Sequence, residues 1–337
     1  LRAMWTHGLP DVLHVHFFHQ FSTSAVTRFP RLVATLLAVR TLVELAVLRV
    51  LGVSLVWTAH DLVNHEQQTP QIEIASKHLL LRFLTTHIIV HCEDAVDIVT
   101  EFYSLPSRVQ DRMTVVPHGT FEDDYPNTVS RSTARERLGL PEDRFVFTFF
   151  GSIRDYKNVP TLVETFAAMD TDAHLVVAGN PHTEALEREV ATAAKGIERV
   201  HTTFEFVPVD EVQLYMNAAD AVVLPFRNDE ASMLTSGSVL LGMSFGRTVV
   251  APDIGCIRAY LADDGGLVYD PSDPNGIERA MRAALAADTD HVGTRNRERA
   301  DGLRWDRVAA ATHAIYSRTG RDGDSRSGTG RALRNRA

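Results

Sequence analysis

Short runs of apolar and β-branched residues alternate with helical patterns along most of this 337-residue chain. That alternation is typical of βα units, in which consecutive parallel strands are joined by helices. The runs that predict strands are residues 12–15, 54–58, 87–91 and 113–116 in the first half, and 145–150, 174–178, 199–205, 221–224 and 248–251 in the second. Several are continuously hydrophobic, as expected of strands covered on both faces. The sequence therefore predicts the α/β class.

The length predicts about two domains, at roughly 150 residues each. Residues 119–131 have the acidic, proline-containing composition of an interdomain linker, so we place the boundary near residue 125. This gives two Rossmann-like domains, over residues 1–125 and 126–318. Ser132 is expected to begin, and Gly139 to end, a short helix after the linker. A helix over residues 305–316 is expected to pack on one or both domains, and residues 319–337 are predicted to be disordered because they carry few hydrophobic side chains.

Composition excludes several classes of protein. The 34 Lys and Arg residues against 43 Asp and Glu residues give a net charge of −9, which offers no general attraction for nucleic acid. Two cysteines, Cys92 and Cys256, are too few for a disulfide framework or a cysteine-rich zinc site, which suits a reducing cytoplasm. Residues 32–48 are apolar but contain Arg40 and Glu44, so no transmembrane helix is predicted. The chain begins at Leu1 with neither an initiator Met nor a signal-peptide pattern, so we expect a missing start.

Two polar segments follow predicted strands of the second half. Gly151, Arg154 and Lys157 come after the strand at residues 145–150, outside the carboxyl end of a strand, where doubly wound sheets bind ligands. Gly151 permits close backbone approach, while Arg154 and Lys157 supply positive charge for a diphosphate. The alternative is a solvated turn with two surface cations.

The second segment, Thr235-Ser236-Gly237-Ser238, opens an apolar helix after the strand at residues 221–224. Free amides and the positive end of the helix dipole form an anion site at such a start, and the serine hydroxyls add donors. A plain Ser/Thr cap is the alternative. Because both segments follow strands of one sheet, together they predict a diphosphate clamp.

The order of these motifs resembles that of GT-B glycosyltransferases, most closely their family 4. The resemblance rests on Gly151 to Lys157 and residues 176–179, 214–225 and 244–252 in the second half, and on residues 10–16, 56–66 and 115–119 in the first. It covers about residues 8–318. Each motif alone is weak, whereas their ordered combination is specific.

The resemblance implies that the C-terminal domain binds a nucleotide-diphosphate sugar and that the N-terminal domain presents the acceptor. Arg154 and Lys157 are then expected to bind the diphosphate and to stabilise the charge that develops on it. His60 matches the family histidine that faces the donor sugar, and Phe206 and Val207 match positions near the nucleotide base. Such enzymes need neither a metal nor a cofactor.

The sequence also departs from the family pattern. Family 4 carries a Glu-x7-Glu pair, at which this chain has Met233 and Leu241. Asp229 and Glu230 in the preceding loop are candidate substitutes, and the alternative for them is a solvated acidic loop. About 60 or more residues of the first domain are expected to be absent, judged from the size of a complete two-domain member.

Ten of the 15 histidines precede Gly119. His14 and His16 share one face of a strand, but no nearby carboxylate or cysteine completes a metal site with His19. We therefore predict no metal, with one or two histidines lining a cleft and the rest structural.

Pro30 and Gly52 bracket a long hydrophobic helix in which Arg40 pairs with Glu44. It packs on the N-terminal sheet or, alternatively, docks on anionic lipid as a peripheral membrane surface with Arg28, Arg31 and Arg49 on one side.

The function predicted from these features is transfer of a sugar from a nucleotide-diphosphate donor to a hydroxyl of a sugar or lipid-linked acceptor, in polysaccharide or glycolipid biosynthesis. A cytoplasmic location, with peripheral contact to the inner face of the plasma membrane, goes with that function. The alternatives are a non-catalytic sugar-nucleotide-binding subunit, a sugar-nucleotide epimerase of the same fold and, last, a periplasmic-type solute-binding protein.

Overall fold

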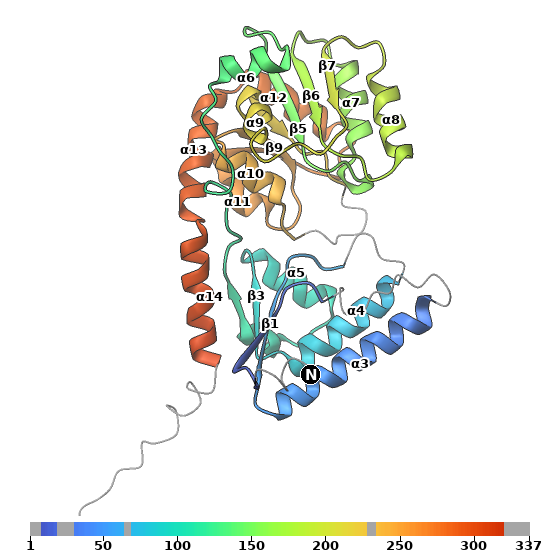
Figure 1. Cartoon of the computed structure of the whole chain (residues 1–337), viewed down its shortest axis with the longest axis vertical. Helices are drawn as coiled ribbons and strands as arrows, with labels where there is room; N and C mark the ends of the chain where they lie inside the picture. The colour runs from blue at the N-terminus through green and yellow to red at the C-terminus, as the bar shows by residue number, and fades with distance from the viewer. Residues whose placement is uncertain (1–7, 19–29, 64–68, 228–233, 320–337) are drawn as a thin grey trace, which may run out of the picture. The chain divides into compact units, whose positions relative to one another are not determined.

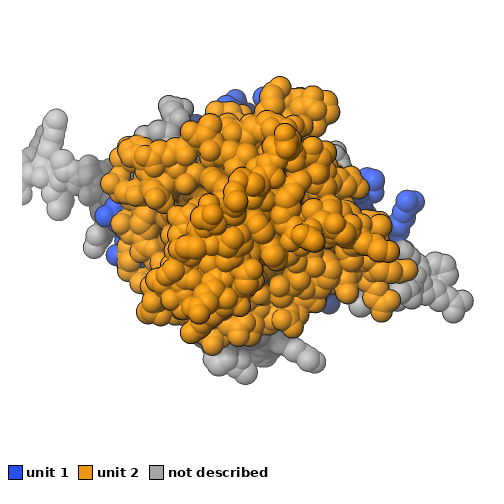
Figure 2. Space-filling view, turned by 90° about the horizontal axis from the view of Figure 1, so that it is seen from above, with its two compact units in different colours: residues 1–117, 232–234, 306–337 blue, residues 118–231, 235–305 orange. Residues whose placement is uncertain are grey.

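The computed structural model describes residues 8–18, 30–63, 69–227 and 234–319 of the chain. The chain divides into two compact units, shown in blue and orange in Figure 2. Unit 1 comprises residues 1–117, 232–234 and 306–337, and unit 2 comprises residues 118–231 and 235–305. Each unit contains one wholly parallel sheet, which confirms the α/β class with two Rossmann-like units. All of the tail that was predicted to be disordered, except Thr319, lies outside the described residues.

Unit 1 is built on a four-stranded sheet of order β1-β2-β3-β4. The strands are β1 (Val12–Val15), β2 (Ser54–Thr58), β3 (His87–Val90) and β4 (Met113–Val115), so two predicted strands are matched and two end one residue earlier. Its helices are α3 (Pro30–Val50), α4 (Pro70–Leu79), which continues as the π-helical η1 (Leu80–Leu84), α5 (Asp94–Phe102) and the 3₁₀ segment η2 (Ser107–Arg112). Helices α3 and α4 lie side by side (Figure 1).

The last helix in the described residues is α14 (Trp305–Thr319), and all of it after Trp305 belongs to unit 1. Its Ile315 is buried with Val56 and Ile89 of the sheet and with Val116, which follows β4, and Val308 and Tyr316 pack beside them. The sequence placed residues 306–318 in the C-terminal domain and put the boundary near residue 125, whereas unit 2 begins at residue 118. The amphipathic stripe was recognised, but a stripe does not specify which sheet will bury it.

Unit 2 has a six-stranded sheet of order β10-β9-β8-β5-β6-β7. Its strands are β5 (Val146–Phe150), β6 (His174–Ala178), β7 (Val200–Thr203), β8 (Ala221–Val223), β9 (Thr248–Pro252) and β10 (Gly266–Tyr269). The sequence reasoning missed β10, because only Leu267, Val268 and Tyr269 signal a strand after a run of acidic and glycine residues. The apolar run of β10 is too short to predict a strand by itself, and its parallel pairing with the buried β9 stabilises it as one.

The helices of unit 2 connect these strands. They are α6 (Arg131–Leu138), the 3₁₀ segment η3 (Asp155–Lys157), α7 (Val159–Ala168), α8 (Glu184–Ala194), α9 (Val212–Ala218), α10 (Gly237–Ser244), α11 (Ile257–Gly265), α12 (Gly276–Ala286) and α13 (Thr289–Gly302). Helix α6 ends at Gly139, as predicted, with a left-handed φ of 66°. Its cap is Ser130 and not Ser132, because the extended Ser130 accepts a hydrogen bond from the Thr133 amide.

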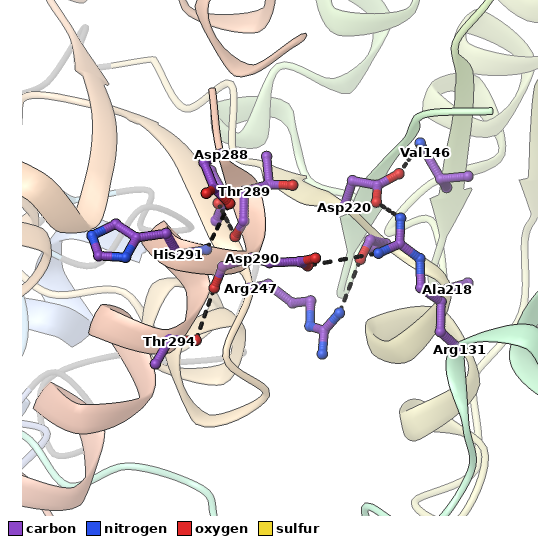
Figure 3. A network of polar contacts seen from close by, with 12 residues as sticks. Arg131, Val146, Ala218, Asp220, Arg247, Asp288, Thr289, Asp290, His291 and Thr294 are labelled. Atoms are coloured by element: carbon purple, nitrogen blue, oxygen red, sulfur yellow. Dashed lines mark hydrogen bonds and ion pairs between the residues drawn. The ribbon is translucent and has the colours of Figure 1, made fainter. Parts of the chain in front are cut away.

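A polar network fastens α6 to the amino ends of β5 and β8 (Figure 3). The Asp220 carboxylate accepts hydrogen bonds from the Val146 amide at 2.6 Å and from Arg135 at 2.7 Å, and it also pairs with Arg131. Arg131 lies 3.7 Å from Asp290 near the start of α13. Arg135 is only 1% exposed, so this network holds a buried cation at the amino ends of the strands, opposite their carboxyl ends.

Candidate functional site

The sheet order of unit 2 creates a switch point between β5 and β8. From β5 the chain continues outward through β6 and β7 on one side, and then returns to β8, β9 and β10 on the other. Ligands of doubly wound sheets bind in the crevice that this reversal leaves at the carboxyl ends of the strands. The described residues at that place are 151–158 after β5, and 224–227 and 234–236 after β8. With the start of α10, these residues include both predicted halves of the clamp.

Gly151 is the point at which the two halves meet. It has a φ of 124°, and a Cβ atom there would lie 3.2 Å from Nζ of Lys157 and 3.6 Å from Oγ of Ser238. The amine of the first loop and the hydroxyl at the start of α10 therefore converge over the same backbone atom. Gly179, which follows β6, packs so closely that a Cβ atom on it would overlap the Gly151 carbonyl group. Sequence reasoning quoted Gly179 in a motif but did not assign it to the site.

Lys157 is a buried cation between aromatic rings. Its side chain ends the short segment η3 and is 8% exposed, with Nζ 5.8 Å from the ring centre of Phe149 and 6.0 Å from that of Phe226. Burial, with a smaller contribution from the nearby charge of Arg154, lowers its pKa from 10.5 to about 8. Such a shift corresponds to a cost of about 3 kcal/mol for the charged form. The structure shows no ion pair of Lys157 with any residue in its described ranges.

Arg154 stands three residues before Lys157 and is half-buried. Its positive charge acts on both Lys157 and Tyr156, lowering the pKa of the lysine and opposing the rise in pKa that burial causes at the tyrosine. Two like charges held this close repel each other, and a bound polyanion relieves that repulsion. The predicted pair of cations is thus brought together on one loop.

The start of α10 completes this cluster. Ser236 is the N-cap residue and is 7% exposed, yet within the described part of the chain its side chain makes no capping hydrogen bond. Gly237 follows, with the Phe121 ring 3.7 Å from where its Cβ would be. The first amides of α10 are therefore available to an anion beside Lys157, as the helix dipole favours. The simpler interpretation, in which Ser236 only caps the helix, does not fit this geometry.

Other predicted residues lie apart from this cluster. Phe206 and Val207 are in the loop after β7, with β6 between that strand and β5, and Phe206 is 76% exposed. Leu241, at the second position of the replaced Glu pair, is buried on α10. The predictions for Asp229, Glu230 and Met233 lie outside the described residues.

In unit 1, His60 follows β2 and is hydrogen-bonded to two further histidines. Its Nε2 is 2.9 Å from Nδ1 of His16, and its Nδ1 is 3.2 Å from Nε2 of His91. His91 was not singled out from the sequence, although it follows β3 as His16 follows β1. Across the described ranges, no cluster of His, Cys, Asp and Glu is placed to hold a metal ion.

His14 and His16 lie together, as their strand positions predicted, with ring centres 4.1 Å apart. Both ring nitrogens of His14 are hydrogen-bonded within the unit, one to the Tyr316 hydroxyl at 2.5 Å and the other to the Thr58 hydroxyl at 2.7 Å. Burial, and to a lesser extent the charge of His16, lowers the pKa of His14 to about 4. His14 is thus a neutral structural residue at pH 7, and His19 lies outside the described residues.

The chain is similar in sequence to known glycosyltransferases. Residues 144–287 match the family described as "Glycosyl transferases group 1". A D-inositol 3-phosphate glycosyltransferase of Xylanimonas cellulosilytica is 31% identical over 221 residues, which cover 61% of this chain and 51% of that protein. The GDP-mannose:glycolipid 4-beta-D-mannosyltransferase of Xanthomonas campestris pv. campestris is 26% identical over 94% of this chain and 82% of its own length. The chain spans about half the length of the first of these relatives.

Solved structures share the fold. Sucrose-phosphate synthase from Thermosynechococcus elongatus superposes with a TM-score of 0.72 at 18% identity, covering 94% of this chain and 75% of that one. Anabaena HepE in complex with UDP gives a TM-score of 0.69 at 15% identity, with 84% and 76% covered. The chain therefore has the two-unit fold of these glycosyltransferases, and most of its second unit matches the family of group 1 glycosyl transferases.

Proposed function

We propose that this protein transfers a sugar from a nucleoside diphosphate donor to a hydroxyl group of a sugar or lipid-linked acceptor. The acceptor oxygen bonds to the anomeric carbon while the bond from that carbon to the diphosphate oxygen breaks. Negative charge then grows on the departing diphosphate. Arg154, Lys157 and the first amides of α10 are the donors that stabilise this charge.

The buried Lys157 is the observation that carries the proposal. Keeping this cation charged beside Phe149 and Phe226, close to the Gly151 backbone, costs about 3 kcal/mol. A diphosphate in the switch-point crevice would compensate for that cost. Because Arg154 and Lys157 supply the positive charge, the proposed reaction needs no metal ion.

The relatives support the classes of substrate. HepE was solved with UDP, and two relatives are named for transfer to inositol phosphate and, from GDP-mannose, to a glycolipid. For this chain we propose a nucleotide-sugar donor and an acceptor used in glycan or glycolipid assembly. Because Leu241 replaces a carboxylate of the family pattern, one alternative function is a subunit that binds the donor but does not transfer the sugar. Hydrolysis or isomerisation of the donor without an acceptor would instead indicate an epimerase.

A thermal-shift screen tests the donor site. UDP, GDP, ADP, CMP and their common sugar conjugates are added with and without EDTA, since a ligand of the folded state raises Tm by mass action. We expect one diphosphate to raise Tm in both conditions. Lys157→Ala and Arg154→Ala should each cost about 2–4 kcal/mol of binding or turnover, whereas the exposed Lys195→Ala should change nothing. Near-wild-type kinetics in both site variants would refute the proposed role of Arg154 and Lys157 in binding the diphosphate.

We also propose that unit 1 contacts an anionic membrane through α3. The face of this helix opposite its buried side is apolar yet exposed, and consists of Leu32, Leu36, Val39, Val43, Val47 and Val50. Arg31, Arg40 and Arg49 flank it. Arg108 and Arg49 also contribute to the lowered pKa of Arg112, after burial, so positive charge gathers near the end of the helix. An apolar face with flanking arginines suits an interfacial helix on anionic lipid.

None of the helices in the described ranges has the length and apolarity that a bilayer span requires. The proposed contact is therefore tested by sedimentation with phosphatidylglycerol and with phosphatidylcholine vesicles. We expect binding to the anionic vesicles alone, reversed by high salt and lost in Leu36→Asp/Val43→Asp. The exposed Val209→Asp in unit 2 is the matched control. No sedimentation with anionic vesicles at low salt would refute the contact.

A further inference from the structure

The first turns of α3 and α4 border a small pocket in unit 1. Its volume is about 260 Å³, and the described residues that line it are Arg31 of α3 and Thr69, Gln71 and Ile72 at the start of α4. The two helices lie side by side (Figure 1). Pockets that hold a drug-sized ligand measure about 300–1,000 Å³, so this one suits a smaller group. Because the positive ends of two helix dipoles adjoin it, an anion is favoured there.

The Thr69 hydroxyl is a buried polar group of this pocket that makes no hydrogen bond to the described residues. Thr69 is the N-cap residue of α4 and is 8% exposed, but its side chain does not cap the helix. The Ile72 amide, which a capping hydroxyl would bind, donates to the Thr69 carbonyl oxygen at 3.1 Å instead. Burying a hydroxyl without a partner costs free energy, and a ligand in the pocket would remove that cost.

Two further donors line the pocket. Pro70 occupies the first position of α4 and has no N–H, so the Gln71 amide is the first backbone donor of this helix and has no partner within it. Arg31 is exposed, and no ion pair joins it to another residue of the described ranges. Glu73, the acidic residue of the first turn of α4, is buried and pairs with Lys77 at 2.8 Å. The pocket thus offers a hydroxyl, an amide and a guanidinium group, which are donors that bind phosphate oxygens.

An exposed apolar surface begins beside the pocket. Leu32 follows Arg31 and is 60% exposed, and Leu36, one turn further along α3, is 61% exposed. These leucines start the face of α3 for which we propose a membrane contact. An interfacial helix rests at the boundary between headgroups and acyl chains, so groups beside its apolar face lie at the level of the lipid phosphates. The pocket at the start of α3 is therefore placed to receive a headgroup.

We propose that this pocket binds the phosphate group of a lipid whose hydrocarbon chains lie against α3. The inference rests on the membrane contact proposed above and adds a headgroup site to it. Arg31 pairs with the phosphate charge, and the Thr69 hydroxyl and the Gln71 amide donate to its oxygens. A phosphate that ends the headgroup, as in phosphatidic acid, presents three oxygens to these three donors. The lipid is thus a phosphate monoester.

Calorimetric titration of the whole protein with monomeric dihexanoyl phosphatidic acid tests the pocket without a membrane. We expect Thr69→Val and Arg31→Gln each to lower the affinity about tenfold or more, because each removes a hydrogen bond to a charged group. Thr192→Val, exposed on α8, and Arg40→Gln, further along α3, are the matched controls and should bind as the wild type does. Wild-type affinity in Thr69→Val and Arg31→Gln would overturn the site.

The stability of Thr69→Val without ligand distinguishes a binding group from a structural one. Because the hydroxyl has no partner in the described part of the chain, its removal should leave Tm unchanged or raise it. A fall in Tm beyond that of Thr192→Val would show that the hydroxyl supports the fold, which would overturn its role as a ligand donor.

Two further ligands distinguish the source of the phosphate. Glycerol 3-phosphate carries the same group without chains, and dihexanoyl phosphatidylcholine carries the chains with its phosphate joined to choline. We expect the phosphatidic acid to bind more tightly than either, and Leu36→Asp to remove its advantage over glycerol 3-phosphate. Equal affinity for glycerol 3-phosphate and the lipid in the wild type would overturn the lipid assignment, and no binding of either would overturn the pocket. Sedimentation with phosphatidylglycerol vesicles tests the membrane contact separately, since that lipid has no phosphate monoester.

Discussion

At the scale of single residues, the buried charge of Lys157 lowers the stability of the fold, and we expect it to strengthen the binding of a diphosphate. Its lowered pKa shows that the folded protein bears the cost of a buried charge. Replacing a buried charge with an apolar side chain of similar size is often neutral or stabilising. We therefore expect Lys157→Met to raise the free energy of unfolding by about 1–3 kcal/mol while abolishing the Tm shift with diphosphates.

Urea denaturation and the thermal-shift assay measure these two effects on the same samples. Lys195→Met is the matched control, because Lys195 is exposed and lies outside the clamp. A variant that loses stability and keeps its diphosphate response would contradict the role assigned to Lys157.

His14 makes stability depend on pH. The folded-state pKa of about 4 lies below the usual 6.5 of histidine, because burial disfavours the charged ring. Between these pH values the unfolded chain binds a proton that the folded chain does not. The contribution of His14 therefore lowers the free energy of unfolding as pH falls from 6.5 towards 4.

Substitution isolates this contribution from those of the other histidines. His14→Gln should flatten the dependence of Tm on pH between 6.5 and 4, whereas His313→Gln, exposed on α14, should leave the slope as in the wild type. Equal slopes in all three proteins would show that His14 is not the group responsible.

At the scale of elements, the Asp220 network attaches α6 to the sheet. Asp220→Ala would leave Arg135 buried without its carboxylate, and breaking such a pair typically costs about 3–5 kcal/mol. Asp253→Ala removes the partner of Arg258 in a mostly exposed pair and should cost under about 1 kcal/mol. Urea unfolding of both variants measures the difference, and equal losses would refute the anchoring role.

Helix α3 shows what a one-dimensional pattern leaves open. Its start at Pro30 and the glycine just beyond its end were evident from the sequence, because proline suits the first turn and Gly52 takes a φ of 87°. Ala34, Ala38 and Leu45 are buried, but Leu36, Val39 and Val43 on the opposite side are exposed. A helix with apolar side chains on two opposite sides does not reveal which side its own domain will cover.

At the scale of the whole molecule, α14 ties the end of the chain to the first unit. Ile315→Ala should lower the free energy of unfolding of unit 1 by about 2–4 kcal/mol, because it removes buried methyl groups from the cluster with Val56 and Ile89. The His14 ring signals report on unit 1 through the contact with Tyr316. Ala311→Gly, on the exposed side of α14, serves as a control for helix propensity.

The outcome for unit 2 distinguishes the two possible assignments of α14. We expect the Ile315→Ala variant still to bind a diphosphate at temperatures at which its His14 ring signals show that unit 1 has begun to unfold. Loss of the diphosphate response with unit 1 intact would instead place the helix with unit 2.

Much of the candidate site was predictable, because its residues occur in short segments with local signals. Gly151, Lys157 and Ser238 follow strands whose apolar runs were plain in the sequence, and parallel strands bring their carboxyl ends to one edge. The tightness of the site was not predictable. That Gly179 packs onto Gly151, and that Phe149 and Phe226 surround Lys157, depends on which strands become neighbours.

The sequence by itself determined the α/β class, the strands other than β10 and the segments that supply the clamp, since strand and helix periodicity and turn chemistry are local properties. Only the tertiary structure decided that α14 joins unit 1, that Arg135 is buried on Asp220, and that His16, His60 and His91 stand in one hydrogen-bonded row. These contacts join residues far apart in the chain. Their partners are chosen by sheet order and by the burial of apolar surface, which no short window of sequence contains.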